Sequence, residues 1–339
     1  MSNILLVFTG GTIGSTAING TINTSSKQGY KLINLFEQAC ADGIKYNFKT
    51  IQPVQLLSEN LFPSVWEILI TAIEAENISQ FDGIIITHGT DTLAFTAAAL
   101  SFYFNTITIP ILLVSSDFPL DHPQANGLSH FICALEFITQ RQESGVFVPY
   151  KNHNSATLIH LGTRLSSCLQ LSSDFISVQS KAYLGFENNT FYQQNAISPT
   201  ECIKTELTAK YSTGVLLIKP YPGLDYSHFK LDQVDAVIHD LYHSGTACST
   251  EEWGRNHSLL QFIQKCKEHK IELYMAPAVK NAEAYESTRS LIELGAKMIW
   301  NMSLESAYVK LLLVYGNYSN TDLINRLLEQ NIANEIISS

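Results

Sequence analysis

A glycine-rich segment near the start of the chain carries a hydroxyl group in a setting that suits chemistry. Residues 9–14 read Thr-Gly-Gly-Thr-Ile-Gly and follow an apolar run at 4–8. Glycines let the backbone approach a ligand closely and let amide N–H groups point at an oxyanion, and Thr12 adds its hydroxyl beside them. The segment matches neither a phosphate-binding P-loop nor a dinucleotide fingerprint. It is therefore a candidate reactive loop, with an anion-binding or purely structural turn as the alternative.

A second segment places a hydroxyl and a carboxylate side by side. Residues 87–92 read Thr-His-Gly-Thr-Asp-Thr and lie between an apolar run and a stretch rich in alanine and leucine. Thr90 and Asp91 are the pair that could act on a substrate where a helix begins. The structural alternative is that Thr92 caps this helix, because a threonine side chain satisfies free backbone amides there, and that His88 is hydrogen-bonded in the core.

Both segments need elements that position them, and the pattern of the chain predicts an α/β architecture. Short β-branched apolar runs alternate with longer segments of helical period. Buried parallel strands have such continuous runs, and ligands bind beyond their carboxyl ends, where loops lead into helices. We expect strands at 4–8, 83–87, 109–114, 215–218, 236–239 and 272–275, and helices at about 64–79, 92–104, 258–269 and 283–295.

The same pattern predicts two domains with mostly parallel, doubly wound sheets. Residues 194–212 have few long apolar runs and two threonine-rich stretches, which favours a boundary there. We therefore expect an N-terminal domain over 1–195 that carries the active-site loops, a linker over 196–212, and a C-terminal flavodoxin-like α/β domain over 213–339.

Composition excludes several classes of protein. The 339 residues are 45% hydrophobic and 15% charged, and 21 Lys and Arg against 31 Asp and Glu give a net charge of −10. This balance argues against a nucleic-acid partner and against a membrane-surface protein, since both need clustered cations. No apolar run approaches the roughly 18–20 residues that span a bilayer, and the N-terminal stretch lacks a basic region.

The cysteines and the missing cofactor motifs give further expectations. Six cysteines are scattered along the chain, and none belongs to a Cys-x-x-Cys pair. We expect unpaired thiols in a reducing compartment, which favours the cytoplasm, and neither a bound metal nor a cofactor.

Together the two segments, about 75 residues apart, resemble the bacterial asparaginase family in its cytoplasmic type I branch. The resemblance covers roughly residues 3–315. Ser58-Glu59-Asn60 is similar to the loop that holds the substrate's α-carboxylate and α-amine, and residues 114–120 are similar to the loop that follows a later strand. Residues 241–247 resemble a segment of the family's second domain.

The resemblance implies an acyl-enzyme mechanism in which a threonine hydroxyl attacks a side-chain amide. Carried over to this chain, the catalytic residues are Thr12, Thr90 and Asp91, and Asp91 also holds the substrate's ammonium. Ser58 binds the α-carboxylate, Glu59 binds the α-amine, and the backbone amides of Thr12 and Thr90 are candidate oxyanion donors. The substrate-binding set that the resemblance implies is Gly11, Ser58, Glu59, Gly89 and Ser116.

The chain departs from the family at the general base. The family carries a lysine about 70 residues beyond the aspartate, yet no lysine lies between Lys151 and Lys181. Arg164 stays protonated and cannot accept the proton of a threonine. His160, whose pKa is ordinarily near neutral, is an alternative base, with a structural role as its alternative.

Two further departures concern the lid and the charge of the pocket. Where the family has a lid tyrosine, this chain reads Asn-Gly-Thr-Ile at 19–22, so the lid candidates are Thr21 and, nine residues later, Tyr30. Asp117 adds a negative charge where the family has a neutral residue.

These observations favour an amidohydrolase that converts L-asparagine or a related amide to aspartate and ammonia. Two alternatives stay open: a binding or regulatory protein with little or no turnover, and an amidase for a larger or modified substrate. The expected partner is a small asparagine- or aspartate-like molecule, with neither nucleic acid nor membrane involved. The resemblance also implies a homodimer or homotetramer.

Overall fold

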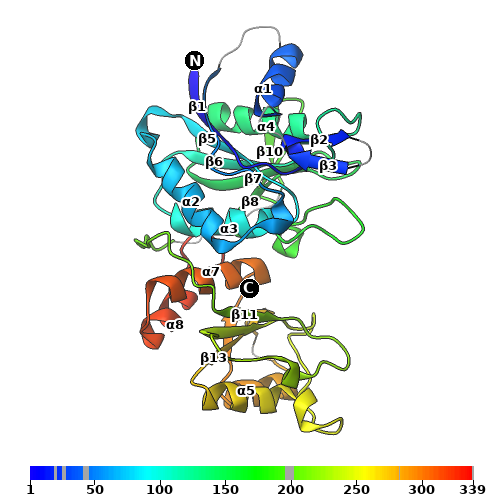
Figure 1. Ribbon diagram of the computed structural model, residues 1–339, viewed down its shortest axis with the longest axis vertical. Helices are drawn as coiled ribbons and strands as arrows, with labels where there is room; N and C mark the ends of the chain where they lie inside the picture. The colour runs from blue at the N-terminus through cyan, green and yellow to red at the C-terminus, as the bar shows by residue number, and fades with distance from the viewer. Residues whose placement is uncertain (19–20, 25–27, 41–45, 195–201, 282, 338–339) are drawn as a thin grey trace. The chain divides into compact units, whose positions relative to one another are not determined.

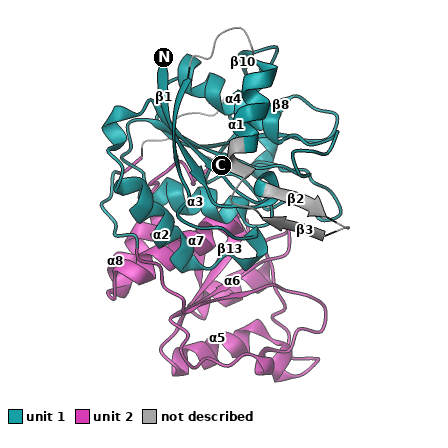
Figure 2. Ribbon diagram, turned by 45° about the horizontal axis from the view of Figure 1, so that its top comes forward, with its two compact units in different colours: residues 1–199, 204–209 teal, residues 200–203, 210–339 magenta. Residues whose placement is uncertain are grey.

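The structure, a computed structural model, describes residues 1–18, 21–24, 28–40, 46–194, 202–281 and 283–337. For 15–18, 21–24 and 28–30 it describes the backbone elements alone. The chain divides into two compact units, coloured separately in Figure 2. Unit 1 comprises 1–199 and 204–209, and unit 2 comprises 200–203 and 210–339. The domain limits expected from the sequence stay a prediction, and the linker residues 196–201 lie outside the described part.

Unit 1 is built around an eight-stranded sheet in the order β10-β9-β8-β7-β6-β5-β1-β4. The strands from β4 to β7 are parallel, and β8, β9 and β10 extend the sheet in antiparallel fashion. The strand bounds are β1 Ser2–Phe8, β4 Tyr46–Ile51, β5 Gly83–Thr87, β6 Pro110–Val114, β7 Gly145–Lys151, β8 Thr157–Leu161, β9 Leu184–Glu187 and β10 Thr190–Gln193. A separate antiparallel hairpin joins β2 Ser15–Ile18 to β3 Thr21–Thr24.

Four helices cover the two faces of this sheet, as Figure 1 shows. They are α1 Gln28–Ala39 and α4 Gly127–Gln140 on one face, and α2 Pro63–Glu74 and α3 Leu93–Tyr103 on the other. The central strands β5 and β6 are buried at every residue. Continuous burial on both faces is what their unbroken apolar runs require, and an aromatic cluster around Phe36 and Phe131 fills the side under α1 and α4.

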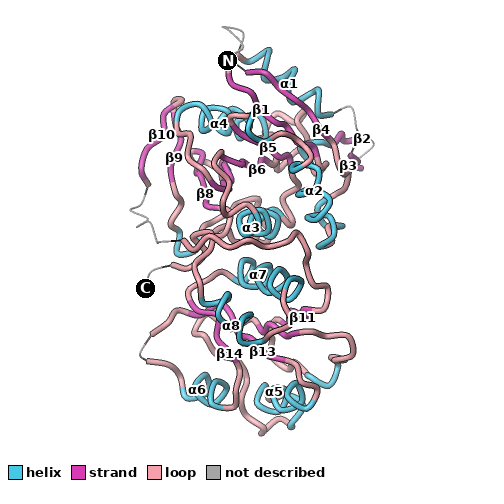
Figure 3. Tube along the Cα trace, turned by 90° about the vertical axis from the view of Figure 1, so that its left-hand side faces the viewer, coloured by secondary structure: helices cyan, strands magenta, loops and turns pink. Residues whose placement is uncertain are grey.

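Unit 2 is a four-stranded parallel sheet in the order β11-β12-β13-β14. Its strands are β11 Val215–Ile218, β12 Ala236–His239, β13 Glu272–Ala278 and β14 Lys297–Trp300. Figure 3 shows α7 and α8 on one face and α5 and α6 on the other. These helices are α5 Leu259–Glu268, α6 Glu286–Glu293, α7 Leu304–Asn317 and α8 Thr321–Glu329.

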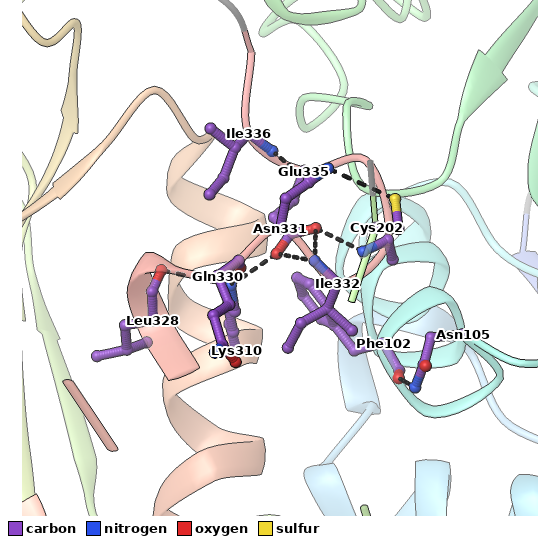
Figure 4. Close-up of polar contacts among 11 residues, drawn as sticks. Phe102, Asn105, Cys202, Lys310, Leu328, Gln330, Asn331, Ile332, Glu335 and Ile336 are labelled. Atoms are coloured by element: carbon purple, nitrogen blue, oxygen red, sulfur yellow. Dashed lines mark hydrogen bonds and ion pairs between the residues drawn. The ribbon is translucent and has the colours of Figure 1, made fainter. Parts of the chain in front are cut away.

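A buried ion pair fastens the end of the chain to unit 2 (Figure 4). Lys310 of α7 and Glu335 are both buried, and Lys310 Nζ lies 2.6 Å from Glu335 Oε1. Lys310 also donates to the carbonyls of Leu328 and Gln330, at 3.3 and 2.5 Å. Glu335 accepts hydrogen bonds from the amide of Ile332. A buried pair is tolerated when its remaining hydrogen bonds are satisfied in this way.

The α/β class with two largely parallel, doubly wound sheets is thus confirmed, but the expected elements leave out several strands, among them β7, β8 and β9 within the larger sheet, and two expected helices differ in length. The helix expected at 64–79 ends at Glu74 and is followed by a separate 3-10 turn, Ile78–Gln80. The helix expected at 283–295 is shorter, Glu286–Glu293. The sequence pattern did not reveal β4, because this edge strand alternates polar and apolar residues and leaves most of them exposed or half-buried.

Candidate active site

The expected site residues lie on loops that follow adjacent parallel strands. In the sheet β5 lies beside β1 and β1 beside β4, and the loops after these strands carry Thr12, Ser58 and Thr90. The helix that follows β1 covers one face of the sheet, whereas the helix that follows β5 covers the other. Between β1 and β5 the chain therefore has a topological switch point, where open α/β sheets form their ligand crevice.

The two glycine loops come so close that neither tolerates a side chain. A Cβ on Gly11 would lie 2.4 Å from the amide nitrogen of Gly89, and Gly11 has a φ of +72°. A Cβ on Gly89 would lie 2.4 Å from Ser58 Oγ. The amide of Gly11 also donates to the carbonyl of Leu56, at 3.0 Å. The glycines expected to bind substrate thus hold three loops in contact, a role that requires hydrogen in place of a side chain.

Ser58 is the hydrogen-bonding centre of the site. It is buried, and its hydroxyl donates to Asp91 Oδ2 at 3.1 Å while accepting the amide of Asp91 at 3.2 Å. Thr92 donates its hydroxyl to the carbonyl of Ser58 at 3.0 Å. The capping role considered for Thr92 is therefore wrong: Thr92 stands at the N-cap of α3 but makes no side-chain cap. Its hydroxyl ties the Ser58 loop to the Asp91 loop instead.

The two threonines expected to act chemically have uncommitted hydrogen-bond donors. Thr12 begins a 3-10 turn, Thr12–Gly14, and both Thr12 and Thr90 are half-buried. Within the described part of the chain, neither their hydroxyls nor their amide N–H groups donate a hydrogen bond. Half-exposed donors of this kind at the carboxyl ends of two neighbouring strands are available to a substrate and to a developing oxyanion.

His88 has the structural role that was the alternative to chemistry for this segment: it is hydrogen-bonded in the core. It is buried, with Nδ1 2.7 Å from the carbonyl of Gly89 and Nε2 2.9 Å from the hydroxyl of Thr96. Trp66 Nε1 donates to the same hydroxyl at 3.0 Å. Burial lowers the pKa of His88 to about 4, so its neutral ring holds the turn that presents Thr90 and Asp91.

Glu59 differs from Ser58 in its surroundings. Its carboxylate is exposed within the short 3-10 turn Ser58–Asn60, and no hydrogen bond to it comes from the described residues. An exposed carboxylate next in sequence to Ser58, whose hydroxyl contacts Asp91, can meet an ammonium group without a large desolvation cost.

The loop after β6 is stiffened by reciprocal hydrogen bonds. The Ser116 hydroxyl donates to the carbonyl of Phe118 at 2.6 Å and accepts the amide of Gly127 at 3.2 Å. The amide of Asp117 donates to Asn126 Oδ1, and the amide of Asn126 donates to Asp117 Oδ1, at 3.0 and 3.3 Å. Because its hydroxyl is committed to this loop, Ser116 can meet a substrate through its backbone.

The lid candidates are placed only by their elements. Thr21 begins β3, Tyr30 lies in α1, and their side chains are outside the described part of the structure, as are Asn19 and Gly20.

The segment that lacks the lysine brings a thiol toward the site. The thiol of Cys168 donates to the carbonyl of Ser172 at 3.4 Å. Burial raises the pKa of Cys168, and the carboxylates of Asp91 and Asp174 raise it further. A neutral thiol therefore lies within electrostatic reach of Asp91, and sequence reasoning gave no signal for it.

His160, the alternative base, lies within the core rather than among the threonines. It belongs to β8 and is buried, with Nδ1 2.7 Å from the hydroxyl of Ser177. Burial and, to a smaller degree, nearby His130 lower its pKa to about 4. Its Nε2 and the hydroxyl of Ser115 are buried without a hydrogen-bond partner in the described part of the chain. Such groups ordinarily bind an ordered water or a ligand.

Over the residues that the structure describes, no group of three His, Cys, Asp or Glu side chains is arranged to hold a metal ion. Within the same residues, no helix has both the length and the apolar character that crossing a bilayer requires.

The fold and the loop geometry define an α/β protein with a hydroxyl-bearing loop site at a sheet switch point. Residues 3–197 match the family described as "Asparaginase, N-terminal". The chain therefore belongs to the asparaginase family and is an asparaginase-family amidohydrolase.

Relatives with two different names match nearly the whole of this chain. It is 29% identical to a glutamyl-tRNA(Gln) amidotransferase subunit of Methanococcus maripaludis strain C7, over 100% of this chain and 82% of that protein. It is 27% identical to L-asparaginase of Thermococcus kodakarensis, over 99% of both chains. A solved structure, the thermostable L-asparaginase from Thermococcus kodakarensis, shares the fold with a TM-score of 0.82 at 24% identity, covering 99% of this chain and 100% of that one.

Proposed function

We propose that the protein hydrolyses the side-chain amide of L-asparagine, giving aspartate and ammonia, with Thr12 as the nucleophile. The observation that carries the proposal is the contact between the glycine loops, which brings the Thr12 and Thr90 segments together at the switch point of the sheet. A small molecule such as asparagine suits a site formed by loops that a rigid sheet holds in position.

In the proposed reaction, the Thr12 oxygen bonds to the amide carbon and forms a tetrahedral oxyanion. Uncommitted amide N–H groups of Thr12 and Thr90 stabilise that oxyanion, and each such donor is worth roughly 3–4 kcal/mol in comparable sites. The C–N bond then breaks, and ammonia leaves with the proton of the threonine hydroxyl. Water cleaves the resulting ester, with Thr90 and Asp91 assisting, and restores the Thr12 hydroxyl.

Recognition of the amino-acid end falls to Ser58, Glu59 and Asp91. The hydroxyl of Ser58 and the amides of its loop meet the α-carboxylate, while the carboxylates of Glu59 and Asp91 meet the α-ammonium. The reciprocal hydrogen bonds between Ser58 and Asp91 orient both groups before substrate arrives. Gly11, Gly89 and the backbone of Ser116 complete this binding set.

The setting of the protein is part of the same proposal. Each of the six cysteines is a thiol outside any disulfide, as is usual in a reducing compartment, so we place the enzyme in the cytoplasm. We also propose that it assembles as a homodimer or homotetramer, which light scattering of the purified protein tests.

The second candidate function is binding of asparagine or aspartate with little turnover. The absence of a lysine between Lys151 and Lys181 favours it, because general-base assistance is typically worth 10²–10⁴-fold.

The experiment that separates the two is ammonia release by purified protein given asparagine, alongside calorimetric binding of aspartate. Turnover of asparagine well above a denatured-protein blank supports the enzyme. Tight aspartate binding with no ammonia release supports the binding protein. Glutamine serves as the matched substrate, since it differs from asparagine by one methylene.

A further inference from the structure

A polar cavity lies against the loop that follows β6. It has a volume of about 670 Å³, within the range of pockets that hold small organic ligands. Asp117 borders it and follows Val114, which pairs with Thr87 at the ends of β6 and β5. Two and three residues beyond Thr87 stand Gly89 and Thr90. The cavity therefore begins one strand away from the threonine loop.

Cys168 also relates the cavity to the loop that carries Thr90 and Asp91. The carboxylates of Asp91 and Asp174 both act on its thiol, and Asp174 borders the cavity. The Thr90–Asp91 loop and the cavity wall at Asp174 are thus both within electrostatic range of Cys168.

The walls of the cavity are held in place before any ligand binds. Asn126 donates its side-chain amide to the carbonyl of Lys151, at 3.2 Å, in addition to its bonds with Asp117. Asn152 clasps the backbone of Phe175 with both side-chain atoms, at 2.7 and 2.9 Å. Asp174 Oδ1 accepts the amide of His153 at 2.9 Å. Such fixed walls reduce the ordering cost of binding.

Several lining groups are uncommitted and offer both donors and acceptors. Among the described residues, no hydrogen bond reaches the side chains of Gln124, Ser129 and Asn154. Amides and hydroxyls of this kind, together with the second oxygens of Asp117 and Asp174, can pair with ligand hydroxyl groups, which donate and accept alike.

An aromatic face completes the cavity. Phe118 borders it and is 36% exposed, and its ring stacks on His122 with centroids 4.2 Å apart and planes 16° apart. A flat apolar ring beside hydroxyl-binding groups suits a ligand with both an apolar face and a polar edge.

The charge of the cavity selects among substituents. Asp117 and Asp174 repel an anionic group, such as the free carboxylate of a β-aspartyl peptide. Lys151 also borders the cavity, which offsets the attraction for a cation. A neutral, hydroxyl-rich group is the one that these walls favour.

We propose that this cavity is a subsite for a sugar ring carried on the amide nitrogen, so that the enzyme cleaves N-glycosylated asparagine in preference to asparagine. This inference rests on the proposed function, with Thr12 attacking the same amide carbon. The Thr12 oxygen bonds to that carbon, the C–N bond breaks, and the nitrogen leaves as a glycosylamine with the proton of the hydroxyl. Water then cleaves the ester, releasing aspartate and restoring Thr12.

The test compares three amides: asparagine, asparagine bearing N-acetylglucosamine on its amide nitrogen, and β-aspartyl-lysine. Calorimetry on the Thr12→Ala variant measures their binding without turnover, and kcat/KM is measured on the unmodified enzyme. We expect the sugar-bearing amide to exceed asparagine at least tenfold in both affinity and kcat/KM. Phe118→Ala and Gln124→Ala should each lower that ratio severalfold, whereas Phe62→Ala, an exposed phenylalanine outside the cavity, should not.

The outcomes separate this inference from the proposed function. If asparagine is hydrolysed but the sugar-bearing amide binds no tighter, the subsite is refuted and the proposed function stands. Tighter binding of β-aspartyl-lysine also refutes it, in favour of a cation site. If no amide is hydrolysed, the proposed function fails, and the binding ratio on Thr12→Ala still decides the subsite.

Discussion

In the proposed site, Ser58 and Glu59 divide recognition between a buried hydroxyl and an exposed carboxylate. Ser58 is fixed by two hydrogen bonds to Asp91, so it orients a neighbour as well as a substrate. Glu59 keeps its charge at the surface, where an ion pair is weaker than a buried one.

This difference predicts the behaviour of Glu59→Gln. The variant should raise the KM for asparagine about tenfold, or ~1.4 kcal/mol, while kcat changes little, because the lost contact holds the ammonium group and not the reacting amide. Steady-state kinetics measure both constants. Glu37→Gln, an exposed carboxylate in α1, is the matched control, and an unchanged KM in Glu59→Gln would show that this loop does not bind the amine.

The missing lysine predicts a gain of activity. Because Cys168 lies within electrostatic reach of Asp91, Cys168→Lys places an amine within electrostatic range of Asp91, the residue that follows the second threonine. We expect kcat on asparagine to rise at least tenfold, since a positioned base is typically worth 10²–10⁴. Cys168→Met provides a side chain of similar bulk without a base. Equal rates for the two variants would contradict this assignment of the segment.

Sequence reasoning reached the site residues through their local motifs, and it missed what depends on packing. Thr12, Thr90 and Asp91 were proposed because glycine and hydroxyl residues follow apolar runs at recognisable spacing. The reciprocal clasp of Asp117 and Asn126 joins residues nine apart through a loop that carries no periodic signal. Thr92 was assigned to capping because threonine is common at the first position of a helix. That preference depends on the local sequence and cannot reveal the carbonyl of Ser58, which accepts the Thr92 hydroxyl in the folded chain.

At the scale of elements, loops on adjacent strands are held together by contacts that exclude side chains. Gly11 and Gly89 pack backbone against backbone, and Thr9 donates its hydroxyl to the carbonyl of Thr87 at 2.6 Å. The apolar runs of β1, β5 and β6 predicted these strands, because burial on both faces demands them. The polar edge strand β4 and the antiparallel strands β8 to β10 lack such a continuous apolar run. They are strands because they pair with neighbouring strands, which the local sequence does not reveal.

Gly11→Ala and Gly14→Ala form a matched pair that tests the loop contact. In Gly11→Ala the new Cβ meets the backbone of Gly89, and the residue keeps a φ of +72°, so we expect at least a hundredfold loss of kcat and a lower melting temperature. In Gly14→Ala nothing lies within 4 Å of the new Cβ. Thermal melts and ammonia assays on both variants decide, and similar activity in the two would contradict the packing argument.

At the scale of the whole molecule, buried neutral histidines tie stability to pH. Burial lowers the pKa of His88, His130, His160 and His239 to about 4 each. In the unfolded chain a histidine takes up its proton near pH 6.5. Between about pH 4 and 6.5 the unfolded state therefore binds more protons, and stability is lost as the pH falls.

This linkage predicts that the free energy of unfolding decreases from about pH 7 to about pH 5. Each histidine contributes at most about 1.4 kcal/mol per pH unit within that window. Urea titrations at several pH values measure the decrease. His160→Gln should reduce the slope, and His153→Gln, which removes an exposed ring, should leave it unchanged. A stability that is constant or rises on acidification would overturn the argument.

The central claim is that the loops after β1 and β5 form one hydrolytic site, and ammonia release from asparagine tests it most directly. The unmodified protein, Thr12→Ala, Thr90→Ala and the exposed control Thr71→Ala are assayed side by side, with circular dichroism to verify folding. We predict a loss of at least about a thousandfold in kcat for Thr12→Ala and for Thr90→Ala, and none for Thr71→Ala. Retention of the full rate by either folded loop variant would contradict the claim.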